Sequence, residues 1–194
     1  MEKREPVKER ILHAASDLFY REGIRAVGID RIIAESGVAK ASFYRSFATK
    51  DDLVVAYLEQ KFQRSLQRIE AARSRHPDDP LGQLRHLFGQ LAPRIAEPDF
   101  RGCPFMNAAV EFPDTSHPGY VKSTECCRTL WSHVTEIARE AGARDPEALS
   151  AQLEIAYRGT IMTSYLYKGE RGADHFLHIA MLLIEDHIPH GTRR

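Results

Sequence analysis

The sequence has no long apolar run, which excludes a conventional membrane-spanning helix. Its longest purely apolar stretch covers the six residues Ile179–Ile184, far short of the roughly 20 residues that cross a bilayer. The first residues, Glu2–Glu5, are all charged and do not resemble the apolar core of an export signal. We therefore expect no membrane contact and a cytoplasmic protein.

Cysteine is scarce as well, at three residues, and two of them are adjacent: Cys103, Cys126 and Cys127. An odd set of this kind is a poor disulfide framework and is typical of a reducing compartment. No four-residue Cys/His zinc spacing occurs, and no glycine-rich loop suited to phosphate follows a strand pattern. We expect no metal, no cofactor and no enzymatic activity.

The chain has no formal net charge, because its 27 Lys and Arg residues balance its 27 Asp and Glu residues. The balance is uneven along the chain: residues 1–50 carry ten basic and seven acidic side chains, and the remainder has an acidic excess of three. A basic N-terminal module on an acidic body suggests a polyanionic partner at one end only.

Helical periodicity runs through nearly the whole chain, and no alternating strand pattern stands out, which predicts an all-α fold. The sequence predicts about nine helices, at about 6–22, 29–36, 40–47, 50–75, 81–95, 105–112, 119–141, 146–167 and 174–187. Thr49 and Asp145 are the expected capping residues of two of them, and Gly169 is expected beyond the end of the eighth. We expect two domains, one of three helices at 1–50 and one of six helices at 51–194.

Residues 28–47 predict a helix-turn-helix. Gly37 permits the left-handed backbone of a tight turn, and Phe43 and Phe47, four residues apart, anchor the second helix in the core. The other positions of that helix are small, hydroxyl-bearing or cationic: Lys40, Ala41, Ser42, Tyr44, Arg45 and Ser46. Such a face enters a DNA major groove without collision, so we predict binding to double-stranded DNA.

This stretch resembles the DNA-binding module of the TetR (tetracycline-repressor) family, in which the helix-turn-helix is followed by Phe, a short break, Lys and an acidic pair. Here those residues are Phe47, Lys50, Asp51 and Asp52. The resemblance covers about residues 8–58, and the size and helix count of the remainder agree with it. It implies a transcriptional regulator, expected to be a repressor, that binds a palindromic operator as a homodimer and is released by a small-molecule effector. By the same resemblance, residues 1–50 are expected to form the DNA-binding domain, and residues 51–194 the ligand-binding and dimerisation domain.

The resemblance also implies which residues meet DNA. Those expected at the bases or the groove edge are Lys40, Ala41, Ser42 and Arg45. Tyr44 and Lys50 would contact phosphates, as would the backbone N–H groups at the helix start formed by Gly28 and Ile29. The family usually has Ser or Thr at the position of Gly28, so the side-chain cap and its phosphate contact are missing here.

The segment Arg101–Phe112 resembles a Gly-Cys motif found at the base of the effector domain in one subgroup of the same family. We expect an apolar pocket for an organic effector, lined by Cys103, Phe105, Met106, Phe112, Trp131 and Tyr165. Core packing is the alternative, because Met and aromatic residues at helical spacing are common in cores. The chemistry of the effector is not readable from the sequence.

The last two helices carry faces suited to a homodimer. The residues expected at the interface are small or apolar: Ala156, Gly159, Thr160, Thr163, Phe176, Ile179 and Leu183. Such faces also suit the core of a single chain, and the resemblance favours the dimer because these helices form a four-helix interface in that family. Two other functions stay open at this point, an enzyme built on helices and an interaction module that has lost DNA binding.

Overall fold

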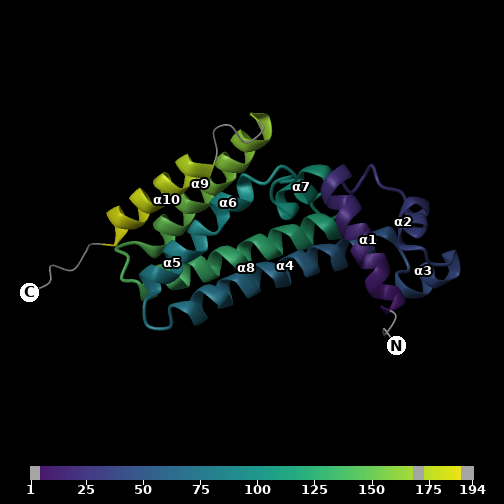
Figure 1. Cartoon of the computed structure of the whole chain (residues 1–194), viewed down its shortest axis with the longest axis horizontal. Helices are drawn as coiled ribbons and strands as arrows, with labels where there is room; N and C mark the ends of the chain where they lie inside the picture. Colours follow the sequence, from purple (N-terminus) through teal and green to yellow (C-terminus); the bar gives the residue numbers. More distant parts are fainter. Residues whose placement is uncertain (1–4, 168–172, 189–194) are drawn as a thin grey trace, which may run out of the picture. The chain divides into compact units, whose positions relative to one another are not determined.

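The computed structural model describes residues 5–167 and 173–188, and within these residues all regular secondary structure is helical (Figure 1). The helices are α1 (Val7–Glu22), α2 (Ile29–Ser36), α3 (Lys40–Ser46), α4 (Lys50–Arg75), α5 (Pro80–Gly89), α6 (Leu91–Ile95), α7 (Pro104–Glu111), α8 (Pro118–Glu140), α9 (Pro146–Leu166) and α10 (Ala173–His187). The predicted all-α fold is confirmed. The helix predicted at 146–167 ends at Leu166, with Tyr167 as its C-cap, and Gly169 lies outside the described residues.

The prediction of a single helix at 81–95 is wrong, because the structure has two helices there, α5 and α6. The apolar spacing continues through α5 and α6, but the helix stops at Gln90 and restarts at Leu91. Pro93 gives the physical reason, because a proline lacks the backbone N–H that a continuing helix needs and is tolerated in the first turn of a new one. The break therefore lies at Gln90, three residues before Pro93.

The chain divides into two compact units, each built from two stretches of sequence. Unit 1 comprises residues 1–63 and 103–126, and unit 2 comprises residues 64–102 and 127–194. The long helices α4 and α8 each contribute residues to both units. The predicted domain boundary after residue 50 is a different division of the chain, and it stays a prediction.

Unit 1 is built around α1, which contacts both α2 and α3. The fully buried apolar side chains come from all of its elements and include Ile11, Leu18, Ile32, Phe43, Leu53, Val54 and Leu58. Phe19 and Tyr57 meet edge to face, with their ring centroids 5.5 Å apart, and this contact joins α1 to the first half of α4. The three small helices are thus fixed to α4 by a shared core.

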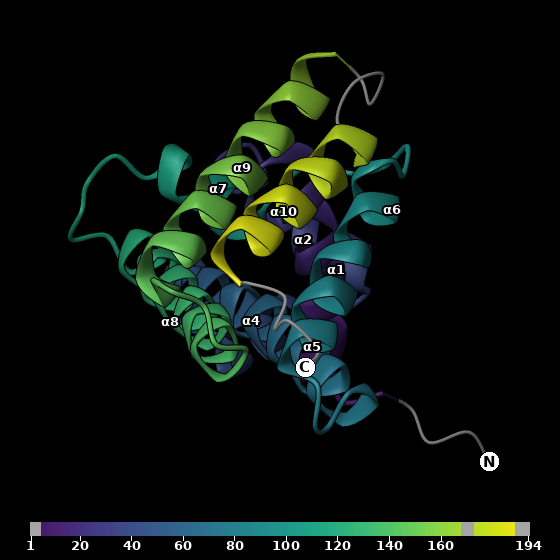
Figure 2. The same cartoon turned by 90° about the vertical axis from the view of Figure 1, so that its left-hand side faces the viewer.

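Unit 2 has its own core, formed mainly between α5, α6, α8, α9 and α10. Figures 1 and 2 both show α9 and α10 running side by side. Phe88 lies at the centre of an aromatic cluster, with ring centroids 6.0 Å from Phe176 and 6.5 Å from Trp131. None of the helices in the described part of the chain is long and apolar enough to cross a membrane.

Candidate DNA-binding surface

The turn between α2 and α3 is built as the sequence predicts. Gly37 has φ +60° and ψ 33°, the left-handed conformation that ends α2, and its N–H donates to the Ala34 carbonyl over 3.3 Å. A side chain from α1 also supports the turn, because the Arg10 guanidinium donates to the carbonyls of Ser36 at 2.6 Å and Gly37 at 3.0 Å. Sequence reasoning missed Arg10, since nothing near it in the chain indicates which carbonyls it reaches.

The inner side of α3 is anchored by two phenylalanines. Phe43 is completely buried and Phe47 nearly so, and their ring centroids are 6.4 Å apart. The predicted anchoring role of both residues is therefore confirmed. Burying the inner face in this way fixes which side chains of α3 face outward.

The outer side of α3 is exposed in the structure. Lys40, Ala41, Tyr44 and Arg45 are exposed, and Ser42 is half-buried. The Arg45 guanidinium donates to the Ser42 hydroxyl over 2.9 Å, which holds the arginine along the helix. Tyr44 packs the edge of its ring against Phe43, with centroids 5.4 Å apart. The exposure needed for groove entry is present, and the DNA contacts of these residues stay a prediction.

Lys40 has a neighbour that the sequence analysis did not identify. Its ammonium lies 3.1 Å from the Asp30 carboxylate, which comes from the first turn of α2. This hydrogen bond and the negative charge of Asp30 raise the pKa of Lys40. Both side chains are exposed, so the pair is weak and a DNA phosphate can compete for the lysine.

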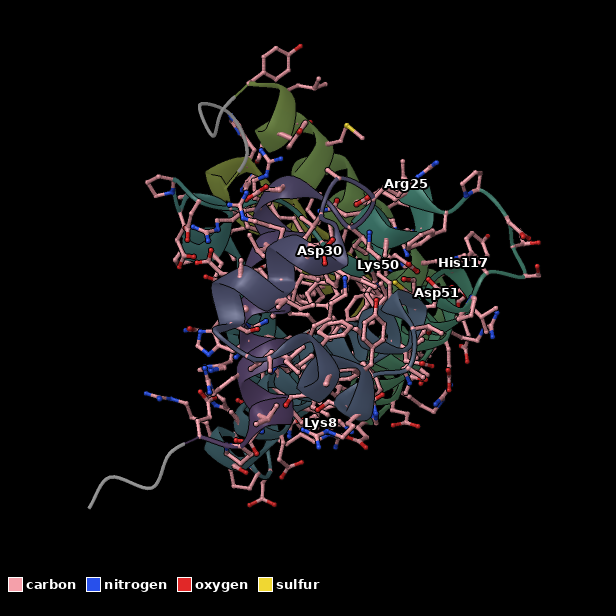
Figure 3. The ribbon with its side chains drawn as sticks, turned by 90° about the vertical axis from the view of Figure 1, so that its right-hand side faces the viewer. Lys8, Arg25, Asp30, Lys50, Asp51 and His117 are labelled. Carbon is pink, nitrogen blue, oxygen red and sulfur yellow. The ribbon has the colours of Figure 1, made fainter. Side chains whose placement is uncertain are left out.

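The start of α4 has a local cap, and Lys50 is the first residue of this helix. The Thr49 hydroxyl accepts the Asp52 N–H over 3.0 Å, and the Asp52 carboxylate accepts the Thr49 N–H over 2.9 Å. This reciprocal arrangement is a capping box, and the predicted cap at Thr49 is confirmed. Asp51 faces His117, whose Nε2 lies 3.5 Å from a carboxylate oxygen, as Figure 3 shows.

Lys50 itself is half-buried, and its ammonium lies 5.9 Å from the centre of the Phe19 ring. Burial lowers the pKa of Lys50, while the negative charges of Glu111 and Asp51 oppose the shift. The structure thus places this lysine at the edge of the unit 1 core, with part of its side chain exposed. Its predicted phosphate contact stays a prediction.

The start of α2 lacks a side-chain cap, as expected from glycine at position 28. Gly28 is exposed in an extended conformation, Ile29 is half-buried, and within the described residues the helix start has no side-chain cap hydrogen bond. The preceding loop is held from a distance, because the Glu111 carboxylate accepts the backbone N–H groups of Ile24 and Arg25. Sequence reasoning gave Glu111 no role.

The residues predicted to line one effector pocket are divided between the two units. Cys103 and Phe105 are buried in unit 1, where Met106 and Phe112 are half-buried. The remaining two belong to unit 2, in which Trp131 packs in the aromatic cluster and Tyr165 is exposed. A single pocket that includes all of them stays a prediction.

The residues predicted at a dimer interface lie on α9 and α10. Gly159 and Ile179 are exposed, and the half-buried members of the set are Ala156, Thr160, Thr163 and Leu183. Phe176 is completely buried, with its ring 6.0 Å from that of Phe88 and 6.1 Å from that of Tyr157. It belongs to the core of its own chain and leaves no surface for a second one, so it is removed from the predicted interface.

The part of the chain that the structure describes contains no group of three or more His, Cys, Asp or Glu side chains placed to hold a metal ion. Basic side chains, hydroxyl groups and uncapped backbone N–H groups together suit a phosphate-bearing partner.

Comparison with known proteins gives a consistent result. Residues 11–57 match the family model described as bacterial regulatory proteins, tetR family. The crystal structure of SCO4454, a TetR-family transcriptional regulator from Streptomyces coelicolor, is 35% identical, with a TM-score of 0.88 over 93% of this chain and 95% of that one.

Two curated relatives match at lower identity. The HTH-type transcriptional repressor DhaR from Mycobacterium sp. strain GP1 is 27% identical over 90% of each chain. The uncharacterized HTH-type transcriptional regulator YezE from Bacillus subtilis is 27% identical, and that match spans about half of each chain, 52%. The similarity thus extends from the helix-turn-helix to the whole chain.

Proposed function

The chain belongs to the TetR family of DNA-binding transcriptional regulators, and from this premise we propose that it represses transcription by binding a palindromic operator as a homodimer. The outward face of α3 carries this proposal, because Tyr44 and Arg45 are exposed beside a buried phenylalanine anchor. One helix-turn-helix reads only a few base pairs, and two half-sites one DNA turn apart provide the rest. An operator-binding protein acts at the chromosome, which for a bacterial regulator is in the cytoplasm.

Selection of bound duplexes from a random DNA pool, followed by binding measurements at fixed salt, tests the DNA-binding surface. We expect a palindromic consensus and a loss of about 5- to 150-fold in affinity for Arg45→Ala, since one bidentate base contact is worth about 1–3 kcal/mol. Arg128→Ala, which changes an exposed arginine in the middle of α8, is the matched control and is expected to bind as the wild type does. A chain that selects no sequence, or an Arg45 variant that binds normally, would favour an interaction module without DNA binding.

The proposed dimer interface is a stripe of exposed apolar and small residues on α9. Ile155, Gly159, Met162 and Leu166 follow each other at intervals of four, three and four, so they lie on one helix face. Ile155 is 72% exposed and Leu166 is 64% exposed, which is unusual for large apolar side chains in a single chain. A second copy would cover this stripe.

The molar mass in solution tests the dimer. The double variant Ile155→Asp/Met162→Asp places two charges on the stripe, and we expect it to elute as a monomer at a concentration where the wild type is a dimer. Val110→Asp is the control, because Val110 is 82% exposed in unit 1 and lies outside the stripe. A wild-type monomer, or a charged variant that still dimerises, contradicts the proposal.

We further propose that unit 1 holds the effector. Gln60 Oε1 and Ser123 Oγ are buried in unit 1 and have no hydrogen-bond partner among the described residues. A buried polar atom without a partner costs about 1–3 kcal/mol, which a bound ligand with a polar group would offset. Cys103, Phe105 and Met106 of the same unit supply apolar surface for the rest of such a ligand.

A thermal-shift screen with small apolar molecules that carry one hydrogen-bonding group tests this effector site. A true effector raises the melting temperature, because it binds only the folded chain, and it also releases the selected operator. Ser123→Ala should weaken its binding, whereas Ser164→Ala, which changes a buried unpartnered serine of unit 2, should not. Equal effects of the two variants would contradict a site in unit 1.

A further inference from the structure

The carboxylate of Glu111, the last residue of α7, accepts hydrogen bonds from a loop that lies far from it in the sequence. Glu111 Oε1 accepts the Ile24 N–H over 3.0 Å, and Oε2 accepts the Arg25 N–H over 2.7 Å. Both oxygens are therefore used on two consecutive backbone groups, 87 and 86 residues earlier. Hydrogen bonds to an ionised carboxylate are about twice as strong as those between neutral groups.

The loop that Glu111 holds leads directly into α2. It begins at Gly23, whose φ of +93° favours glycine, and a Cβ there would lie 3.4 Å from both Glu111 carboxylate oxygens. It ends at Gly28, the N-cap of α2, which provides no side-chain hydrogen bond. The position of the α2 start is thus fixed through the loop and not by a cap of its own.

The same carboxylate acts on a second part of the DNA-binding surface. Its negative charge favours the protonated form of Lys50 and opposes the burial that lowers the pKa of that residue. Figure 3 labels two basic residues near this carboxylate's targets: Arg25, in the loop before α2, and Lys50, the first residue of α4. One acidic side chain from α7 therefore influences both the start of α2 and the lysine at the start of α4.

We propose that Glu111 is a positioning residue for operator recognition, which holds the loop before α2 and thereby sets how α2 and α3 meet the DNA. The proposal rests on the proposed function of the α2–α3 surface. It implies that operator recognition depends on where α7 holds the Glu111 side chain. Base-edge contacts require accurate placement of side chains, whereas binding to DNA of arbitrary sequence is electrostatic and tolerates small displacements. Loss of the Glu111 contacts should therefore reduce specificity more than general DNA affinity.

The test compares Glu111→Gln, Glu111→Ala and Asp114→Asn in the full-length chain. Glutamine keeps the shape of the side chain but has one acceptor oxygen and places an N–H group against the loop donors. Asp114 is the matched control, since its carboxylate accepts the Ser116 N–H over 2.9 Å and the Ser116 hydroxyl over 2.7 Å, in the loop just after α7. The control variant loses the same charge near the end of α7 and keeps an acceptor oxygen for the Ser116 groups, without touching the loop before α2.

Affinities for the selected operator and for a scrambled duplex of equal length are measured at the same salt, and their ratio is the readout. We expect both Glu111 variants to lower this ratio about tenfold, the size of roughly one lost base-pair contact. The Asp114 variant should keep the ratio within about twofold, because it changes only long-range charge. Partial unfolding would lower both affinities together and leave the ratio unchanged, so the ratio separates positioning from stability.

Hydrogen exchange of the Ile24 and Arg25 amides supplies a second readout. Both should exchange faster in the Glu111 variants and at the wild-type rate in the Asp114 variant. A wild-type ratio in both Glu111 variants overturns the positioning role and leaves the proposed function intact. A wild-type chain that selects no operator overturns the proposed function itself.

Discussion

Two helices that begin in unit 1, α2 and α4, are held in place by opposite means. Helix α4 has 26 residues and caps its own start, through Thr49 and Asp52. Helix α2 has eight residues and no side-chain cap, and its loop and its last turn are held by Glu111 of α7 and Arg10 of α1. A helix of two turns is not stable alone, so partners elsewhere in the chain determine where it lies. The orientation of the helix-turn-helix thus depends on α1 and α7.

Removing the support at the end of α2 is expected to have the largest effect on stability. Arg10→Met keeps most of the aliphatic length but loses the charged hydrogen bonds to the Ser36 and Gly37 carbonyls. We expect the free energy of unfolding, measured with denaturant, to fall by about 2 kcal/mol, because bonds to a charged group are worth about 1.5–3 kcal/mol.

The matched control for this prediction is another arginine of α1. Among the described residues, Arg21 makes only an exposed ion pair with Asp17, at 3.5 Å, and such a pair contributes at most about 1 kcal/mol. Arg21→Met should therefore change stability by less than half as much as Arg10→Met. Equal losses in the two variants would mean that the turn after α2 does not need its distant partner.

Breaking the local cap of α4 should have a smaller effect. Thr49→Ala removes the acceptor of the Asp52 N–H, and loss of an N-cap costs about 1 kcal/mol. Denaturant unfolding measures the change, and Thr124→Ala is the comparison because that hydroxyl bonds back to carbonyls within α8. The ratio of operator to scrambled-DNA affinity should stay unchanged in Thr49→Ala, and a tenfold drop would show that α4 positions the surface as α2 does.

Giving α2 a cap of its own should have the smallest effect on stability and sharpen the comparison most. A Cβ at Gly28 meets nothing within 4 Å, and φ of −82° suits any residue, so Gly28→Ser is free of strain. Serine caps better than glycine by a few tenths of a kcal/mol. We expect Gly28→Ser to restore part of the specificity ratio lost in Glu111→Gln, because the helix start is then supported locally.

Alanine at the same position separates capping from bulk. Gly28→Ala adds the Cβ without the hydroxyl, and alanine is a poorer N-cap than glycine. Combined with Glu111→Gln, it should restore none of the lost ratio. Equal rescue by serine and alanine would contradict a capping effect.

The difference between α2 and α4 also explains what the sequence predicts and what it does not. Local signals predict well: the Thr49 cap, the Gly37 turn and the Asp145 cap, whose carboxylate accepts the Ala148 N–H over 2.9 Å, all appear in the structure. Contacts over 26 or 87 residues, such as those of Arg10 and Glu111, leave no local pattern, because each side chain is ordinary for its helix. Sequence reasoning therefore found the surface but not its supports.

Apolar faces show the same limit in unit 2. Phe176 and Ile179 lie one helical turn apart on α10, yet Phe176 is completely buried and Ile179 is 43% exposed. Periodicity places both on broadly the same side of the helix, and only the packing of α10 on α5, α6 and α9 separates core from surface. A predicted apolar face thus identifies the side of a helix that is buried. It does not identify which surface packs against that side.

Hydrogen exchange of the full-length chain, free and bound to the selected operator, tests the central claim most directly. Operator binding by the α2–α3 surface predicts slower exchange of backbone amides within residues 28–50, with the largest change at the start of α2 and along α3. Slower exchange confined to other parts of the chain, with residues 28–50 unchanged, would contradict the account.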